Sequence, residues 1–568
     1  MRIFDINIFK STNNTMKLKA FQTVLFVFAA SLLMVSCSKK SNTQGKNIPA
    51  NAAVVVIVNG ASISTKLPWE EVKQNELYKI LSTDSGMSSI AKSALDNPDN
   101  TGIDSKKDLI FFMVKDSSGA YVGATGTLKD EATFKVYNTA TLTMGIAAEK
   151  DGVQFITDRT TSVSWTKEKF FIVFDAPQIN QASQLNRMMM DDSTASQVGN
   201  KPRNVEAVAA SLHKLEEKNS LAKNEKFSEL MGSKADVHFW MNSEALYEGD
   251  AAMAALSMLN ISKLYKDSYN TATVNFENGQ INLDSKTYSG KEMSDIFKKY
   301  SGANINKEMI QRMPAKDVAV LFAMNYKPEG LKELIKLTGV EGLINIGASQ
   351  LGFNVDDFIK SHNGELLFAV TDIKIDSMFG TPNPNVLFST GVGDKASFDK
   401  IVNAAQKAGA QMASASPNSI YFTSNGKIFA LGNQKGMVDN FVNKDAKSNF
   451  AFLDKISGGP IGGYFNLQYI LTSLKPSVKG DSSAIIMMDA SLKMWDNILI
   501  SGGQFKDGSL QQHVEINLVD KNTNSLKQLN NYLGTLGKLA KENESRLGWN
   551  QPDFSSDDIV IPTVPVIE

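Results

Sequence analysis

The chain carries an internal repeat, which limits the folds available to it more than any other feature. Ile48-Pro49-Ala50 precedes a β-branched run, and Met313-Pro314-Ala315 precedes a similar run. Five further pairs of similar segments follow in the same order in both parts. The paired segments begin at Thr101 and Leu351, Gly123 and Phe388, Asn224 and Ser448, Val237 and Gly462, and Phe276 and Phe505. An ordered set of similar segments is typical of duplication. We therefore predict two tandem copies of one domain, residues 48–305 and 306–545.

Each copy is predicted to be of the α+β class. Short β-branched or aromatic runs, such as residues 54–58 and 170–174, alternate with helix signals. Pro68 and the acids that follow it predict the start of one helix, and Asp394 the start of another. Phe276-Glu277-Asn278-Gly279 and its counterpart near Phe505 predict hairpin turns. Many hairpins and few long crossovers predict mostly antiparallel sheets, with helices packed on one side.

Two segments depart from the repeat. The first copy holds an insertion at about residues 180–219, in which Met188-Met189-Met190 precedes apolar residues at helical spacing, from Val205 to Leu215. This pattern predicts a loop leading into an amphipathic helix, and the alternative is a soft, methionine-rich binding surface. Residues 546–568 contain prolines among Val and Ile, which predicts an extended C-terminal tail.

The beginning of the chain predicts a membrane anchor. Lys17 and Lys19 precede an apolar run at residues 21–35, which has the organisation of a secretory signal and is short for a transmembrane helix. Residues 1–36 form this predicted signal, and the start is Met1 or Met16. Ser36-Cys37 resembles the lipobox of bacterial lipoproteins, in which the cysteine is acylated, for example with palmitate. The sequence departs from the usual lipobox at Met34, three positions before the cysteine, where leucine is common.

Cys37 is the only cysteine. One alternative is a secreted protein with a spare thiol, but an unpaired thiol is a liability in an oxidising compartment. We therefore expect lipidation of Cys37, and each buried methylene of its acyl chains contributes about 0.8 kcal/mol to membrane binding. Residues 37–47 are then the lipidated cysteine and a flexible polar tether. The predicted mature chain has no other thiol for disulfides, metal ligation or nucleophilic catalysis.

The order of lipobox, polar tether, Ile48-Pro49-Ala50 strand and Thr101-Gly102-Ile103-Asp104 resembles a known family. It is similar to the uncharacterised Bacteroides-group lipoproteins that contain domain of unknown function 4836. The resemblance covers nearly the whole mature chain and implies an anchored envelope protein, with no catalytic residues to carry over. An acidic run after the cysteine often accompanies surface export in this group. None is present, so the periplasmic side of the outer membrane is favoured over the cell surface.

Charge and composition give no sign of a nucleic-acid partner. The 59 Lys and Arg residues nearly balance the 60 Asp and Glu residues, for a formal net charge of −1. Neither a basic patch nor an acidic tail stands out in the sequence. The expected partners are the lipid bilayer, through acylated Cys37, and an envelope protein or a glycan.

A search for catalytic and metal-binding patterns leaves few candidates. His213, His238, His362 and His513 lack the i, i+4 spacing of a helical zinc site and are predicted to be surface or hydrogen-bonded sheet residues. The segment from Asn97 to Asp108 sketches a calcium loop around Gly102, but it lacks carboxylates at key positions. We predict instead a turn with glycine in a left-handed conformation. We expect no metal, cofactor or catalytic residue.

Two short patterns suggest modification or catalysis. Ser193 and Ser377 lie in sequences that resemble the O-glycosylation sequon of Bacteroides-group envelope proteins. Ser211 and Ser397 begin S-x-x-K matches, but the K-T-G and S-D-N motifs of penicillin-recognising enzymes are absent.

Two functions remain open at this point. The first is a non-catalytic envelope lipoprotein that binds a partner or supports an assembly through its paired domains. The alternative is an envelope hydrolase that acts on a glycan or peptide through dispersed carboxylates, which would need about 5–9.5 Å between the paired acids. The sequence favours the first.

Overall fold

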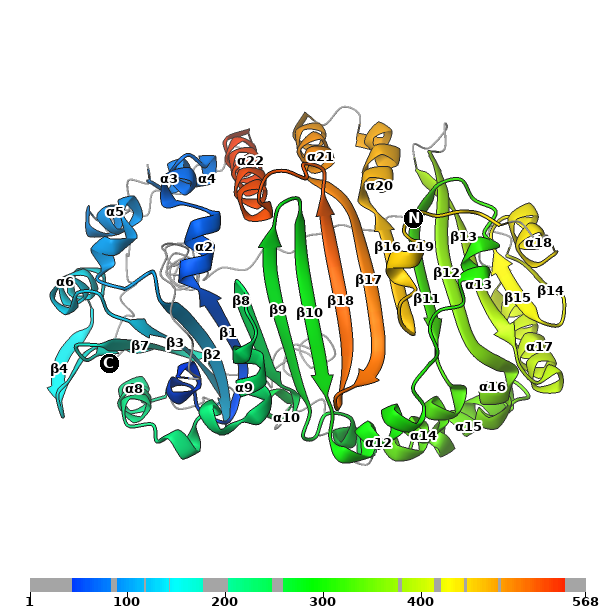
Figure 1. The fold of residues 1–568 in the computed structure, drawn as a ribbon, viewed down its shortest axis with the longest axis horizontal. Helices are drawn as coiled ribbons and strands as arrows, with labels where there is room; N and C mark the ends of the chain where they lie inside the picture. Colours follow the sequence, from blue (N-terminus) through cyan, green and yellow to red (C-terminus); the bar gives the residue numbers. More distant parts are fainter. Residues whose placement is uncertain are drawn as a thin grey trace, which may run out of the picture.

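The computed structural model describes residues 43–82, 89–116, 119–142, 144–176, 203–247, 259–375, 381–412, 420–443, 447–478 and 482–546. These residues form one antiparallel sheet of 18 strands, with helices around it (Figure 1). The predicted signal at residues 1–36, much of the predicted insertion and nearly all of the predicted tail lie outside the described residues.

The strands fall into two groups along the chain. The first group is β1 (Ala52–Asn59), β2 (Asp108–Asp116), β3 (Gly119–Thr127), β4 (Ile146–Lys150), β5 (Val153–Thr157), β6 (Thr161–Trp165), β7 (Lys169–Ala176), β8 (Val237–Asn242), β9 (Tyr269–Glu277) and β10 (Gln280–Tyr288). The second group is β11 (Val318–Asn325), β12 (His362–Ile375), β13 (Pro382–Val392), β14 (Tyr421–Ser424), β15 (Ile428–Gly432), β16 (Ile461–Asn466), β17 (Trp495–Lys506) and β18 (Ser509–Leu518).

Backbone pairing gives the order of the strands in space. In the first half the order is β4-β5-β6-β7-β3-β2-β1-β8-β9-β10. In the second half it is β14-β15-β13-β12-β11-β16-β17-β18. The halves join where β10 pairs with β18, from Gln280 opposite Asn517 to Tyr288 opposite Ser509. The last strands of the two halves are therefore neighbours at the centre of the sheet.

Most helices lie at the ends of the strands or beside the sheet. Those of the first half are α2 (Gly60–Lys66), α3 (Trp69–Lys73), α4 (Glu76–Ser82), α5 (Ser89–Asp96), α6 (Glu131–Thr141), α8 (Val205–His213), α9 (Glu225–Gly232), α10 (Ser243–Tyr247) and α12 (Lys291–Lys299). Those of the second half are α13 (Lys307–Gln311), α14 (Pro328–Thr338), α15 (Glu341–Gln350), α16 (Val355–Ser361), α17 (Lys395–Met412), α18 (Lys435–Asn443), α19 (Leu453–Ile456), α20 (Leu467–Leu474), α21 (Ser482–Met494) and α22 (Ser525–Arg546).

Several predicted elements are confirmed. Pro68 is the N-cap of α3, and the Asp394 carboxylate accepts a hydrogen bond of 2.9 Å from the Ser397 amide at the start of α17. The hairpin turns are also present, and Asp507 and Gly508 have φ values of 51° and 76° between β17 and β18. Such a left-handed pair is typical of a tight two-residue hairpin turn.

The amphipathic helix predicted within the insertion is α8, and its apolar side faces the sheet. Val205, Ala209 and Leu212 are at most 2% exposed and belong to the core of the first half.

The predicted tether is shorter than expected. Gln44–Asn47 form a 3-10 helix, η1, in which Gly45 is buried. A Cβ at Gly45 would lie 2.6 Å from the backbone nitrogen of Ala222, so only glycine allows this close approach.

Side chains alternate between two faces of the sheet, which we call front and rear. The front face, toward the viewer in Figure 1, carries Val55 and Trp240, and the rear face carries Val54 and Phe239. In the first half α8 and α9 cover the front face, where Phe227 meets Trp240 edge to face at 5.6 Å. In the second half α13, α18 and α19 cover it over a separate core.

The prediction that helices pack on one side of the sheet is wrong. Helix α6 lies on the rear face, where Phe134 packs 5.5 Å from Trp165 and 5.2 Å from Phe170, measured between ring centroids. The reason lies in β7, where residues 170–173 are all buried in succession. A continuous apolar run of this kind needs cover on both faces. The predicted separate sheets are also one continuous sheet.

Candidate binding site

An open cavity of 570 Å³ lies on the front face at the junction of the two halves. Its floor is formed by β9, β10, β18 and β17, and α9 stands at one side. The covering helices of the two cores contact the strands on either side, so the central strands keep polar side chains open to solvent. A concave site with several converging polar groups is the default location for ligand binding.

The centre of the cavity floor is an ion-pair-like contact between the two halves. His513 Nδ1 lies 2.7 Å from Asp284 Oδ1, and the two residues are directly opposite each other in β18 and β10. Thr273 is opposite Asp284 in β9, and Ser501 is opposite His513 in β17. A hydroxyl, a carboxylate, an imidazole and a second hydroxyl therefore stand in one row across four strands.

A second polar cluster closes the side of the cavity near α9. Lys286 Nζ lies 2.7 Å from Glu229 Oε1, and the Lys226 ammonium lies 4.6 Å from the centre of the Tyr288 ring. The hydrogen bond from Lys286 holds the pKa of Glu229 below its usual value. Burial, followed by the nearby Glu229 carboxylate, raises the pKa of Tyr288 above its usual value. Glu229 is therefore ionised and Tyr288 neutral at physiological pH.

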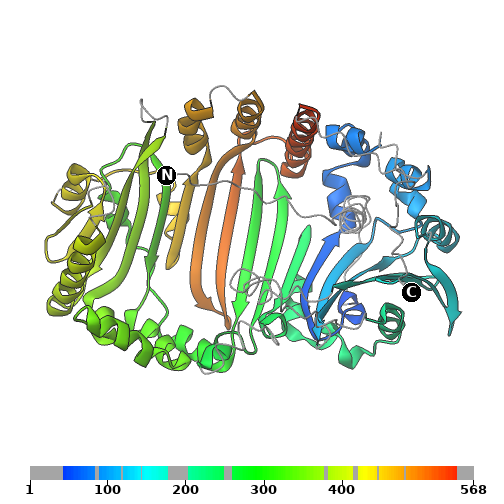
Figure 2. The ribbon, with the colours of Figure 1, turned by 180° about the vertical axis from the view of Figure 1, so that it is seen from behind.

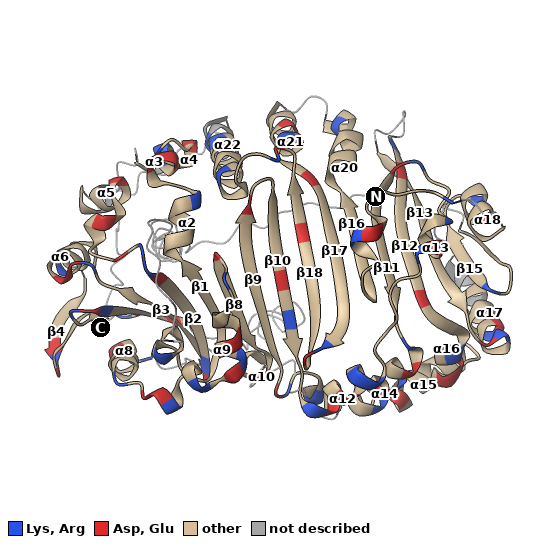
Figure 3. Cartoon of the chain, in the orientation of Figure 1, with Lys and Arg blue, Asp and Glu red and all other residues tan. Residues whose placement is uncertain are grey.

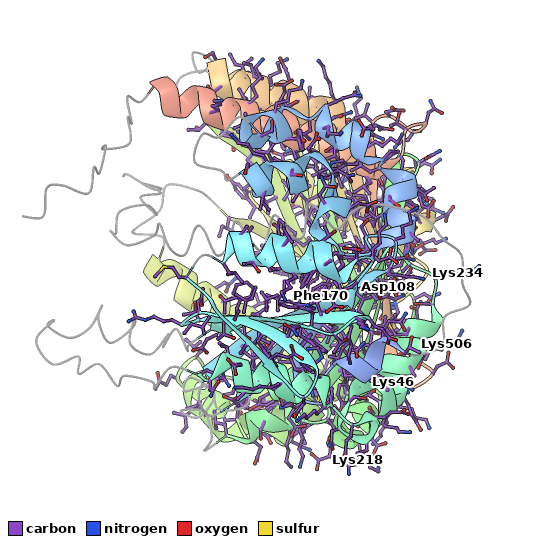
Figure 4. All side chains as sticks on the ribbon, turned by 90° about the vertical axis from the view of Figure 1, so that its left-hand side faces the viewer. Lys46, Asp108, Phe170, Lys218, Lys234 and Lys506 are labelled. Carbon is purple, nitrogen blue, oxygen red and sulfur yellow. The ribbon has the colours of Figure 1, made fainter. Side chains whose placement is uncertain are left out.

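The cavity lining carries no net formal charge when His513 is neutral. Its carboxylates are Glu229 and Asp284, and its ammonium groups are Lys234 and Lys286, so two negative and two positive charges cancel. In the side view of Figure 4, Lys234 and Lys506 lie on the same side of the molecule, which is the front. The remaining polar lining consists of amide and hydroxyl side chains, which both donate and accept hydrogen bonds.

The modification sites predicted from sequence cannot be compared with this cavity. Cys37, Ser193 and Ser377 all lie outside the described residues. Their lipidation and glycosylation stay predictions.

The calcium-like segment forms the predicted glycine turn. Gly102 has a φ of 78°, and a Cβ there would lie 2.4 Å from the backbone oxygen of Asp130 in the approach to α6. Asn97 accepts a hydrogen bond from the Asp99 amide, and the Asp99 carboxylate contacts Lys129 at 2.5 Å. The polar groups of the segment thus serve the turn and its neighbour.

Three histidines have hydrogen-bond partners away from the cavity, and His213 differs from the prediction because it ends helix α8 and is partly buried. His213 Nε2 lies 3.1 Å from Ser164 Oγ, and His238 Nε2 lies 3.0 Å from the Ser233 carbonyl oxygen. His362 Nε2 lies 2.5 Å from the Tyr326 hydroxyl. Among the described residues, no group of three or more His, Cys, Asp or Glu side chains could hold a metal ion.

Sequence reasoning did not identify the cavity residues. The available signal was alternation: Asn282 and Asp284 alternate with Ile281 and Leu283 in β10, as His513 and Glu515 do with Val514 and Ile516 in β18. Alternation shows that one face is polar. It does not show that two strands more than two hundred residues apart are neighbours.

The comparisons with known proteins establish the family. A family model described as domain of unknown function (DUF4836) matches residues 45–431, which is more than half of the chain. The chain therefore belongs to this family. The match runs across the predicted boundary between residues 305 and 306. No curated protein matches the chain.

Solved structures with partial likeness include crystal forms I, IV and III of TP0453. They are 8%, 9% and 11% identical in sequence and cover 44%, 45% and 50% of this chain. The shares of the TP0453 chains covered are 78%, 84% and 90%, with TM-scores of 0.22, 0.23 and 0.24. Likeness at this level carries no argument about fold or role.

None of the helices among the described residues is both long enough and apolar enough to span a bilayer.

Proposed function

We propose that this protein is a lipid-anchored envelope lipoprotein of the Bacteroides group that binds a neutral, hydroxyl-rich ligand, such as a glycan, without catalysis. The observation that carries the proposal is the polar cavity built by both halves of the sheet, whose charged side chains cancel to zero net formal charge. A neutral cavity favours a ligand that exchanges hydrogen bonds over a phosphate or a polyanion.

Two tandem copies of one domain explain how the cavity arises. The strand order β7-β3-β2-β1-β8-β9-β10 in the first half has a counterpart in β15-β13-β12-β11-β16-β17-β18. Each half ends in a hairpin, and the two hairpins pair edge to edge. The ligand site then lies on the approximate two-fold axis between the copies, as in an isologous dimer.

The anchor part of the proposal rests on the sequence around Cys37. Replacing this residue, Cys37→Ser, should move the protein from the membrane pellet to the soluble fraction, because the acyl chains are its attachment. Intact mass measurement should show the loss of the acylated N-terminus. Retention in the membrane at the wild-type level would reject lipidation. Protease digestion on intact and lysed cells would then distinguish the favoured periplasmic side of the outer membrane from the cell surface.

Ligand binding is tested with the full chain in detergent and a panel of neutral oligosaccharides, by calorimetric titration. Gln511→Leu removes hydrogen-bonding groups from the cavity and should weaken binding about tenfold, the equivalent of about 1.4 kcal/mol. Asn282→Leu, on the same face but outside the cavity lining, is the matched control and should bind as wild type. Equal weakening by both variants, or no binding to any neutral glycan, would reject the proposal.

An envelope hydrolase is the second candidate, and one observation favours it. Ser501, His513 and Asp284 stand side by side in three adjacent strands, with the imidazole Nδ1 on the carboxylate, as in a nucleophilic triad. The described contacts do not include a hydrogen bond between Ser501 and His513. Covalent labelling by a fluorophosphonate probe that is lost in Ser501→Ala would favour catalysis over binding.

A further inference from the structure

An apolar row crosses the rear face of the sheet, opposite the cavity. Strand pairing places its members directly opposite one another from Val237 in β8 to Phe422 in β14. The central members of the row are Val274, Leu283, Val514, Ile500, Phe322 and Phe368, and Gly463, which has no side chain, lies between Ile500 and Phe322. At about 4.8 Å from strand to strand, eleven strands give a row about 48 Å long.

The row is open to solvent at its end in the second half, whereas its central members Val274, Leu283, Val514 and Ile500 are half-buried. Phe368 is 39% exposed and Phe422 is 46% exposed, whereas Leu367, which precedes Phe368 and faces the front, is 1% exposed. Figure 2, which views the rear, shows no described helix across the middle of the central strands. Exposed apolar surfaces of this extent are rare on monomers and mark sites of interaction.

The chemistry of the row selects an occupant without polar groups. Each of these strands except β14 at the edge has a hydrogen-bonded neighbour on both sides, so the row offers almost no free backbone donor or acceptor. An extended peptide laid across it would leave its own N–H and C=O groups without partners on that side. A hydrocarbon chain has no such groups, so it loses no hydrogen bonds when it contacts the row.

The helices at both ends of the strands carry further exposed apolar side chains. Leu343 and Ile346 of α15 are 64% and 66% exposed, and Ile486 and Met487 of α21 are 45% and 49% exposed. These helices lie at opposite ends of the strands (Figure 1). Residues 342–353 contain no Asp, Glu, Lys or Arg. Figure 3 shows charged residues mainly on helices and loops around the sheet, with few on its strands.

We propose that the rear face binds the acyl chains of a membrane lipid, and that α15 and α21 contact the bilayer surface. Apolar helix faces of this kind bind at the boundary between headgroups and acyl chains. The row, which crosses the strands between the levels of these two helices, then faces the acyl chains. This proposal does not depend on the ligand of the front cavity.

The test is photocrosslinking of the full chain with vesicles of phosphatidylcholine that carry a diazirine in one acyl chain. Peptides that contain Leu283, Val514 and Phe322 should be labelled. The double variant Leu283→Gln with Val514→Gln should lower the labelling at least fivefold. Its matched control is Asn282→Gln with Glu515→Gln, at the neighbouring positions on the front face, which should label as wild type.

A second pair of measurements separates folding from lipid binding. Leu343→Asp with Ile346→Asp changes only exposed side chains, so the variant should unfold at the wild-type temperature. In the Cys37→Ser background, which removes the anchor, it should associate less with vesicles than Cys37→Ser alone but should still be labelled by a soluble diazirine fatty acid. Labelling that is confined to the front face, or that survives the Leu283 and Val514 substitutions, would overturn the proposal. So would a stable dimer that buries the row and excludes the fatty acid.

Discussion

The front and rear faces of the central strands share one backbone and offer opposite chemistry. On the front, Asp284 and His513 meet in a polar cavity, whereas on the rear the adjacent Leu283 and Val514 meet in an apolar row. The two pairs are neighbours in both strands. Because strand side chains alternate, a sheet four strands wide provides two distinct surfaces without any additional element.

The same comparison separates stability from function. Toward the sides of the sheet, the front face is buried under helices and forms the two large cores. At the centre, no helix of the described residues lies over the middle of either face. We infer that the flanking parts hold the fold, and that the centre is free to carry ligand-binding side chains. The following predictions test this division.

The largest expected change in the free energy of unfolding is in β8. Adjacent residues of this strand allow the two faces to be compared. Trp240 is 1% exposed on the front, whereas Phe239 is only partly buried on the rear. Trp240→Ala should lower the free energy of unfolding by about 3–5 kcal/mol through a core cavity. Phe239→Ala should cost about 1–2 kcal/mol, because less area leaves water on folding. Urea unfolding measures both, and equal losses would contradict the division.

A smaller effect on stability, which depends on pH, is expected from His213 on the covered part of the front face. Burial, followed by the nearby Lys169, lowers the pKa of His213 to about 4. The unfolded chain, with an ordinary histidine pKa near 6.5, then binds the proton more tightly than the folded protein. This contribution destabilises the protein progressively as pH falls from about 6.5 to about 4 and is absent above that range.

The His213 effect is measured as the difference in unfolding free energy between pH 7 and pH 4.5. His213→Gln should show a smaller loss than wild type. His513→Gln, in the open part of the front face, is the matched control and should keep the wild-type loss. A full loss in His213→Gln would show that burial of this ring does not matter.

One substitution in β18 tests further whether fatty acid binds to the rear face and not to the front face. Gln512 is an exposed polar residue that alternation places on the side of Val514, although it also borders the cavity, and Gln511 precedes it on the front. Gln512→Leu should strengthen binding of the diazirine fatty acid about two- to fivefold, which corresponds to about 0.5–1 kcal/mol of added apolar contact. Gln511→Leu should leave fatty-acid binding unchanged. An equal gain in both would mean that the probe does not distinguish the faces.

The smallest expected change in the free energy of unfolding concerns the ion-pair-like contact between Asp284 and His513 at the centre of the cavity. The Asp284 and His513 side chains are 62% and 41% exposed, and exposed pairs contribute little to stability. Asp284→Asn should therefore change the free energy of unfolding by less than about 1 kcal/mol while still weakening ligand binding. A loss comparable to that of Trp240→Ala would place this contact in the structural core.

The sequence by itself determined the local structure of this protein. Alternation and β-branched runs located β1 and β7, capping residues located the start of α17, and Gly508 located a hairpin turn. These features depend on residues close together in the chain, so the physical rules that produce them act on the sequence directly. The tandem duplication that the order of similar segments predicts stays a prediction.

Only the tertiary structure decided that the two halves share one sheet. The contact between β10 and β18 joins residues more than two hundred positions apart, and no local preference specifies it. This pairing creates the cavity around Asp284 and His513 and continues the apolar row through Leu283 and Val514. Alternation in the sequence shows which side chains share a face. The neighbours that a face meets, and whether it is covered, depend on how distant strands pack.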